Sequence, residues 1–224
     1  MNRRYAIFFV LLGIVVLNSC IGVSADITVR ADGSGKIALE YRVSRMAEAL
    51  GRLDGNERWQ TIPAGRADFE RSLARLPGMR LVSFSTKNET NSGGDIINNA
   101  ELEFKNIDAL LAFLDPSGKR SAFSRENGTN KLSLTLLDPA SSTAPGAPDP
   151  QLLELARQVS AGYELNVSFS ADGNASLTLA DGTGATLVPV PAAKVISPGK
   201  KVSLAIGTGE LLSLEHGLTV QFTW

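Results

Sequence analysis

The chain has 224 residues, of which 43% are hydrophobic and 20% are charged, and its formal net charge is −1. This apolar content argues against a disordered chain, and the balanced charge without a basic block argues against nucleic-acid binding through phosphate neutralisation. A single histidine and a single cysteine leave no His/Cys spacing for a zinc site.

The N-terminus is built like an export signal. Arg3 and Arg4 form a positively charged start, and a charge-free apolar run follows at 6–17. A run of about 12 residues is shorter than the roughly 20 that cross a bilayer as a helix. We therefore expect residues 1–19 to be a signal peptide that is absent from the mature protein.

Cys20 closes this segment and is the only cysteine in the chain. Leu17 stands three residues before it and the small Ser19 directly before it, which resembles the lipobox of bacterial lipoproteins, although Asn18 departs from the usual residue there. A thioether to diacylglycerol accounts for one odd cysteine in an exported chain. We predict cleavage before Cys20 and anchoring through acyl chains, in which each buried methylene contributes about 0.8 kcal/mol. The alternatives are an ordinary signal peptide cut near 24–25 and an uncleaved anchor, either of which would leave Cys20 incidental.

The predicted mature chain starts with a short tether and continues as a folded domain. Residues 20–25 precede the first strand-like residue, Asp26, and would span roughly 20 Å when fully extended. The domain, 26–224, is long enough for one large or two small units. A stretch rich in Pro, Ala and Ser at 139–150 is interpreted as a surface loop, with a subdomain boundary as the alternative.

Strand patterns dominate the domain and come in pairs joined by turn residues. Alternating segments flank Asp-Gly, Asn-Gly or similar turns, which tolerate the positive φ of tight hairpins. In chain order, the predicted pairs are 27–30 with 36–43 around Asp32-Gly33, 79–87 with 96–104 around 91–94, 120–125 with 131–137 around Asn127-Gly128, and 163–170 with 175–179 around Asp172-Gly173. Further strands are predicted at 194–196, 201–206 and 218–224.

Helices interrupt this pattern where apolar residues recur at three- and four-residue spacing. They are predicted at 44–53, at 69–76 before Pro77-Gly78, at 106–114 with Asn106 as the cap, and at 150–162, with a helical turn at 211–214. The sequence therefore predicts an α+β fold, in which a mainly antiparallel β-sheet built from hairpins carries three to four covering helices.

No combination of side chains predicts catalysis. His216, followed by glycine, fits the C-terminal end of a helix. Ser197 and Lys200 have the Ser-x-x-Lys spacing of penicillin-recognising enzymes, but the Pro-Gly between them indicates a turn. Glu101 and Glu103 share one strand face, where exposed carboxylates are ordinary. We expect no catalytic residue, metal or cofactor, and assign no ligand-binding residue. An enzyme whose acidic residues converge in space is left open.

Three stretches resemble the LppM-like envelope lipoproteins of bacteria, which pair a lipobox with an α+β domain. They are Cys20 closely followed by the segment 26–35, then 194–200, and finally 218–224. The resemblance implies a connection with lipid or glycolipid binding at the cell envelope. It assigns no ligand residue in this sequence.

The leading hypothesis is a non-enzymatic binding module, anchored to a membrane of the bacterial cell envelope and facing the periplasm or the exterior. Its expected partners are the membrane, through the N-terminal acyl chains, and a lipid, glycan or envelope protein, but not nucleic acid. The alternative is a structural or assembly accessory of an envelope protein complex.

Overall fold

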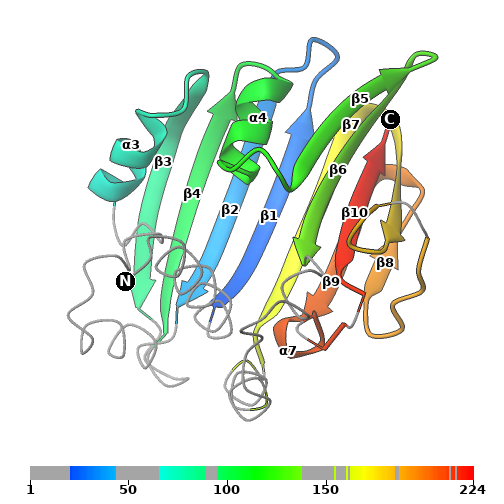
Figure 1. The fold of residues 1–224 in the computed structure, drawn as a ribbon. Helices are drawn as coiled ribbons and strands as arrows, with labels where there is room; N and C mark the ends of the chain where they lie inside the picture. Colours follow the sequence, from blue (N-terminus) through cyan, green and yellow to red (C-terminus); the bar gives the residue numbers. More distant parts are fainter. Residues whose placement is uncertain are drawn as a thin grey trace, which may run out of the picture.

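A curled β-sheet with short helices makes up the described part of the chain (Figure 1). The computed structural model describes residues 21–43, 66–88, 95–137, 154, 160, 162–184, 187–211, 213–214 and 216–224. The strands are β1 (Ile21–Val29), β2 (Gly35–Val43), β3 (Met79–Asn88), β4 (Ile96–Phe104), β5 (Ser121–Glu126), β6 (Thr129–Leu137), β7 (Glu164–Ala180), β8 (Lys194–Ile196), β9 (Gly199–Gly207) and β10 (Leu218–Thr223). Neighbouring strands in the sheet follow the order β3-β4-β2-β1-β7-β10-β6-β5. β9 also pairs with β7, and β8 pairs with β9.

The first predicted hairpin is confirmed. β1 and β2 pair antiparallel, with Ile27 opposite Ile37. In the turn, the backbone N–H of Arg30 donates to the carbonyl of Ser34 at 2.8 Å. Gly33 has a φ of 81°, in the left-handed region that glycine enters at little cost.

β1 begins earlier than the sequence predicts. It starts at Ile21, and residues 21–25 pair with residues 39–43 of β2, so most of the expected tether at 20–25 belongs to the sheet. The small residues in this segment have weak strand propensity, which concealed the strand. Hydrogen-bonding partners on both sides, β2 and β7, override that local weakness.

The sheet is mixed, so the prediction of a mainly antiparallel sheet built from hairpins is correct only in part. β1 and β7 run parallel, with Ile27 opposite Phe169. A parallel pair cannot be joined by a tight turn and needs a long crossover. No local pattern in the sequence therefore indicates this pairing.

The hairpin predicted around Asp172-Gly173 is wrong, because the two segments that flank this turn do not pair with each other. Residues 164–170 pair with β1 and β9, whereas residues 176–180 pair with β10. The register of β7 against β9 shifts between Ser170 and Ala175, and one continuous strand bends there. The Asp172 carboxylate accepts a hydrogen bond from the backbone N–H of Ala31 at 2.5 Å, which ties the bend to the first hairpin. A bend or bulge of this kind lets one strand take part in two packed layers.

The remaining strand predictions are confirmed. β5 and β6 form a hairpin, and Asn127 and Gly128 in its turn have φ values of 51° and 80°, as a tight turn of this type requires. β3 pairs with β4, although their connection at 89–94 lies outside the described residues. β8, β9 and β10 occupy the three strand positions predicted near the C-terminus.

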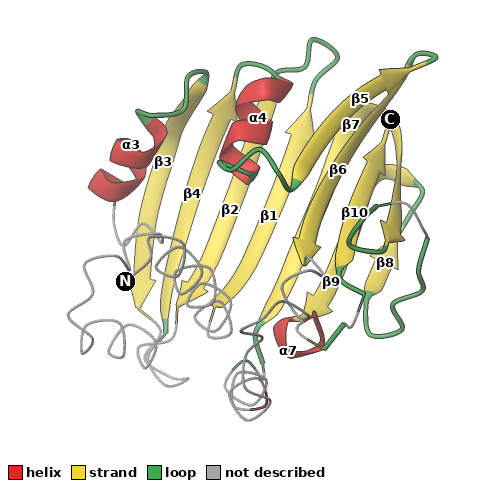
Figure 2. Cartoon of the chain, viewed as in Figure 1, coloured by secondary structure: helices red, strands yellow, loops and turns green. Residues whose placement is uncertain are grey.

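Helices are fewer than predicted. In the described residues, α3 (Arg66–Leu73) and α4 (Ile107–Leu114) have eight residues each and α7 (Thr208–Leu211) has four, so three to four covering helices is wrong. Figure 2 shows α3 and α4 on the same side of the sheet. The helices predicted at 44–53 and 150–162, and the loop at 139–150, lie outside the described residues apart from residues 154, 160 and 162.

Both longer helices form where local signals specify them. The Asn106 side chain accepts a hydrogen bond from the Ala109 N–H at 2.9 Å, which caps α4 as predicted. On α3, Phe69 packs against Tyr41 and Phe84, with ring centroids 6.1 and 5.5 Å away. Each helix thus buries one apolar face against the sheet.

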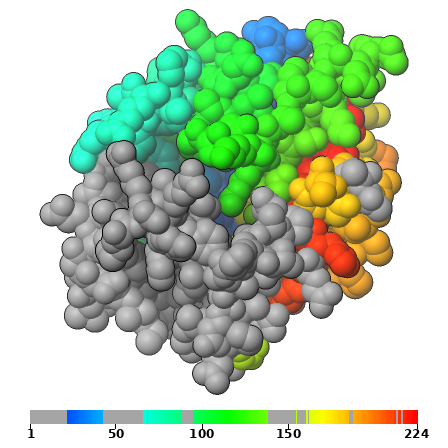
Figure 3. Space-filling model, in the orientation of Figure 1, coloured from blue at the N-terminus to red at the C-terminus, as the bar shows by residue number. Residues whose placement is uncertain are grey.

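The core lies on the face of the curled sheet that α3 and α4 cover, and it includes Leu132 of β6. Figure 3 shows α3 in cyan and the chain from α4 to β6 in green adjoining across the near face. Alternate side chains of β1 and β2, including Ile27 and Ile37, are fully buried. Phe169 stacks on Phe222 and lies against Trp224, with centroid distances of 4.9 and 4.8 Å. These contacts join the half of the sheet in which β7 pairs with β1 to the half in which it pairs with β10.

A search of the described residues for membrane-spanning helices found none that is long and apolar enough.

Candidate functional site

The predicted lipidation site lies beside the start of β1. Cys20 and the recognition residues Leu17 and Ser19 are outside the described residues. The first described residue, Ile21, is already paired with Val43 of β2. In the sequence, Cys20 directly precedes this end of the sheet.

An open pocket of about 220 Å³ lies at the same end. Three strands contribute to it, because β1 is flanked there by β2 and β7. Its lining residues are Gly22, Val23, Ser24, Glu40, Arg42, Gly162, Tyr163, Glu164 and Asn166.

The polar lining comes from the face of the sheet opposite the core. Ser24 pairs with Glu40 on one side and with Asn166 on the other. Cross-strand partners project to the same face, and side chains alternate between faces along a strand. Because Ile27 and Ile37 point into the core, these three polar residues point outward.

Tyr163 closes one side of the pocket. A Cβ placed on Gly22 would lie 3.5 Å from Tyr163 Cδ1 and 3.8 Å from Arg42 Cβ, so the glycine leaves room for the ring. The Tyr163 hydroxyl donates to the Asp95 carboxylate, at 3.2 and 3.4 Å from its two oxygens. This contact joins the residue before β7 to the residue before β4, and Asp95 is buried.

The lining chemistry suits recognition of a polar group. Glu40 and Glu164 offer carboxylate acceptors, Arg42 a guanidinium and Asn166 an amide with both donors and acceptors. Such a set can bind hydroxyl, phosphate or ammonium groups through directed hydrogen bonds. Sequence reasoning missed these residues because the parallel β1–β7 pair, which no local signal predicts, brings them together.

Two residues considered for catalysis take part in backbone structure instead. The Ser197 hydroxyl accepts a hydrogen bond from the Leu177 N–H at 2.7 Å, in the predicted turn between β8 and β9. His216 is exposed, and its carbonyl accepts from the Gly182 N–H at 2.9 Å. The helix α7 ends at Leu211, so placing His216 at a helix C-terminus is wrong: Gly217, with a φ of 68°, turns the chain into β10 instead.

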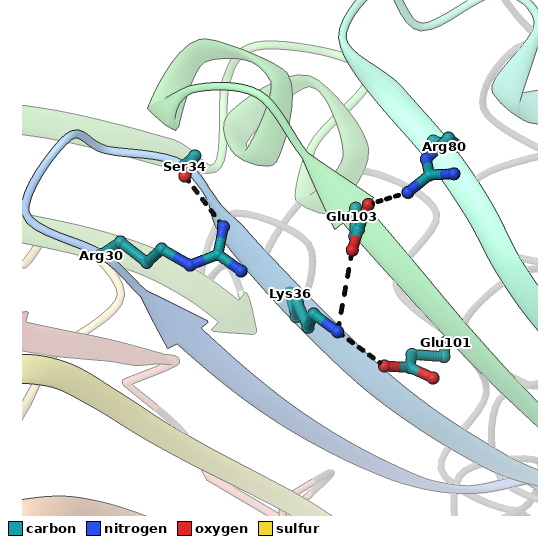
Figure 4. Close-up of polar contacts among 6 residues, drawn as sticks. All are labelled: Arg30, Ser34, Lys36, Arg80, Glu101 and Glu103. Carbon is teal, nitrogen blue, oxygen red and sulfur yellow. Dashed lines mark hydrogen bonds and ion pairs between the residues drawn. The ribbon is translucent and has the colours of Figure 1, made fainter.

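The carboxylates Glu101 and Glu103 lie in a cross-strand ion-pair network, drawn in Figure 4. Lys36 Nζ is 3.2 Å from a Glu101 oxygen and 3.7 Å from a Glu103 oxygen. Glu103 also pairs with Arg80, and the hydrogen bond from that guanidinium holds the pKa of Glu103 below its usual range. The predicted solvated strand face is confirmed, because these side chains are substantially exposed.

Asp115 is a buried carboxylate that organises the loop after α4. It accepts hydrogen bonds from the backbone N–H groups of Ser117 and Ser121, at 3.1 and 2.9 Å, and also from Arg120 N–H and the Ser117 hydroxyl. Burial raises the pKa of Asp115, but these hydrogen bonds lower it by more, and the net pKa is below the usual value. Asp115 therefore stabilises the fold in its ionised form.

Replacing Asp115 with asparagine is expected to lower the free energy of unfolding by about 1–3 kcal/mol at neutral pH. A carboxyl with a depressed folded pKa contributes stability above its unfolded pKa and loses it as pH falls through the folded pKa. The difference from wild type should therefore shrink in acid, as measured by urea unfolding between pH 7 and pH 3. Glu126→Gln, at an exposed hairpin end, is the control, and a pH-independent Asp115→Asn effect would contradict the assignment.

Among the described residues, no three His, Cys, Asp or Glu side chains gather in an arrangement that could hold a metal ion.

The matches to known proteins are matches to solved structures. No protein-family model and no curated protein matches the chain. Among solved structures, the chain is similar to the NMR structure of the folded domain of the LppM protein from Mycobacterium tuberculosis, at 12% identity and a TM-score of 0.37. The match covers 90% of this chain and 88% of that chain.

Proposed function

We propose that the chain is a lipoprotein of the bacterial cell envelope, anchored through acyl chains on Cys20, whose sheet domain binds the polar headgroup of a lipid or glycolipid without catalysing a reaction. The observation that carries this proposal is the position of β1. It begins at Ile21, directly after the only cysteine, which itself ends an export-signal pattern.

The anchor would place the pocket at the level of the lipid headgroups. A strand rises about 3.3 Å per residue, so Ser24 in the pocket is roughly 13 Å along the chain from Cys20. With residues 21–25 held in the sheet, little slack separates the acyl chains from the domain. This geometry supports a headgroup as the ligand, because the pocket and the headgroups would share one layer.

The polar lining supports the same ligand class. Phosphate and sugar hydroxyls are bound in proteins by guanidinium, amide and carboxylate groups, and Arg42, Asn166 and Glu40 supply one of each. Tyr163 adds an aromatic ring beside them, which can contact the apolar part of a headgroup.

Changing Cys20 to alanine is expected to move nearly all of the protein from the membrane to the soluble fraction, because the acyl chains would no longer be attached. Intact mass of the wild-type protein from its native membrane should show a chain that starts at Cys20 and carries added acyl mass. An unmodified chain that starts near residue 25 would contradict the anchor and support an ordinary signal peptide.

The pocket is tested separately from the anchor. In the Cys20→Ala background, Asn166→Leu is expected to weaken binding to vesicles of native-membrane lipid extract by about tenfold, or about 1.4 kcal/mol, because an amide partner is lost. Vesicle flotation measures the binding. Ser170→Leu is the matched control, since it lies on the same strand and face but outside the pocket. Equal binding by both variants would contradict the pocket assignment.

A second candidate function is that of an accessory in an envelope protein complex. It is favoured by apolar side chains that the edge strand β8 exposes to solvent.

A further inference from the structure

β8 is an edge strand with exposed apolar side chains. It pairs with β9 on one side, and in the described part of the chain no strand lies on its other side. The exposed fractions of Val195 and Ile196 are 42% and 65%. Leu187, in the segment that leads into β8, is 67% exposed. β8 lies at the right of the view in Figure 1, away from α3 and α4.

The other two edges differ from β8. Among the described residues, the exposed large hydrophobic residues are Leu187, Val195, Ile196 and Val82. Val195 and Ile196 lie on β8, Leu187 is bridged to Ala180 at the end of β7, and Val82 lies on the β3 edge. Val82 is 38% exposed and sits where the β3–β4 register shifts, and such irregularities discourage pairing with other chains. β5 ends in the charged residues Arg125 and Glu126. Apolar exposure is therefore concentrated at β8.

The two side chains make both faces of this edge apolar. Val195 is opposite Leu204 of β9, and Ile196 is opposite Ser203. Directly opposed residues project to the same face, so Val195 extends the core face and Ile196 lies on the polar face. A strand added beside β8 would meet an apolar side chain on each face.

Lysines give this edge a positive charge. Lys194, Lys200 and Lys201 are all exposed, and Lys201 pairs with Asp26. Among the described residues, Lys194 and Lys200 take part in no ion pair. Lysine alone commonly protects an edge from pairing, but that role does not account for the exposure of Ile196 beside it. Because Val195 and Ile196 are adjacent and lysines lie beside them, this edge complements a segment in which two adjacent apolar residues are flanked by acidic residues.

We propose that β8 is a docking edge for an extended segment of another protein, in which two adjacent apolar residues are flanked by acidic residues, and that this segment adds to the sheet as a further strand. Backbone hydrogen bonds along β8 supply much of the affinity in this mode of binding. Val195 and Ile196 select apolar side chains of the partner, and Lys194 and Lys200 select its acidic ones. The proposal is independent of Cys20 and of the headgroup pocket.

The test uses the purified chain and labelled peptides with two central valines that are flanked by glutamate residues or, for comparison, by lysine residues. Fluorescence anisotropy is expected to show at least tenfold tighter binding of the glutamate peptide. Hydrogen exchange should show new protection of the amides of residues 194–196. Ile196→Asp and Lys194→Glu should each weaken binding at least tenfold. Val82→Asp and Lys87→Glu, which make matched changes on the β3 edge, should leave binding unchanged.

Three results would overturn the proposal. The first is failure of the glutamate peptide to bind, or equal losses in the β3 variants. The second is a concentration-dependent dimer in sedimentation that Ile196→Asp abolishes, which would make a second copy the occupant. The third is binding to anionic vesicles that Ile196→Asp abolishes while the peptide stays unbound, which would assign the edge to a lipid surface.

Discussion

Replacing Phe169 with alanine is expected to lower the free energy of unfolding by about 3–5 kcal/mol, the usual cost of deleting a buried aromatic ring. The side chain is fully buried, and its ring packs against both Phe222 and Trp224. Phe169 precedes the bend in β7, whereas Phe222 lies on β10, which pairs with β7 after the bend, so the cavity would open between these two halves of the sheet. Urea unfolding followed by circular dichroism measures the loss.

The control for this change is Val82→Ala, because Val82 is an apolar residue that is partly exposed on an edge strand. Its effect should stay within about 0.5 kcal/mol. A loss below about 1 kcal/mol for Phe169→Ala would mean that the ring does not join the two halves as the structure indicates.

Gly35→Ala is expected to destabilise the fold by about 3 kcal/mol or more, at the upper end of overpacking effects. A Cβ at this position would lie 2.0 Å from the carbonyl oxygen of Thr28 and 2.3 Å from Cζ of Phe104. The first contact is with backbone in the neighbouring strand, which cannot move without breaking the β1–β2 ladder. The reason is space, since Gly35 is not among the glycines with positive φ.

Two comparisons separate this effect from a general intolerance of alanine. Gly173→Ala, at the bend of β7, places its Cβ where no atom lies within 4 Å and should be nearly neutral. Combining Gly35→Ala with Phe104→Leu should not restore stability, because the contact with Thr28 remains. Full rescue by the second change would show that the ring alone causes the clash. Both are measured by urea unfolding.

Turn chemistry explains which hairpins the sequence predicted correctly. The turns at Asp32-Gly33 and Asn127-Gly128 require positive φ at specific positions, and the flanking strands pair with each other directly. Asp172-Gly173 carries the same signal, and the chain does bend there. The segments that flank this bend pair with β1, β9 and β10 and not with each other.

The pocket was not predicted for a related reason. Ser24, Glu40 and Asn166 are ordinary exposed strand residues when each is considered with its neighbours in the sequence. They become neighbours only because β7 pairs with β1, far away in the chain. Gly22 leaves room for the Tyr163 ring and is the one lining residue whose type relates to the site. A single glycine in a sequence is too common to predict a pocket.

The features that could be predicted from the amino-acid sequence depend on a few adjacent residues. These are the two tight hairpins, the capped start of α4 at Asn106, and the export signal with Cys20, which stays a prediction. Four features depend on contacts between segments far apart in the chain and were seen only in the structure. They are the parallel β1–β7 pair, the bend at 171–174, the early start of β1 and the exposed edge at β8. The physical reason is that turn and cap energies depend on local backbone geometry, whereas strand pairing depends on which partners bury the most apolar surface across the whole chain.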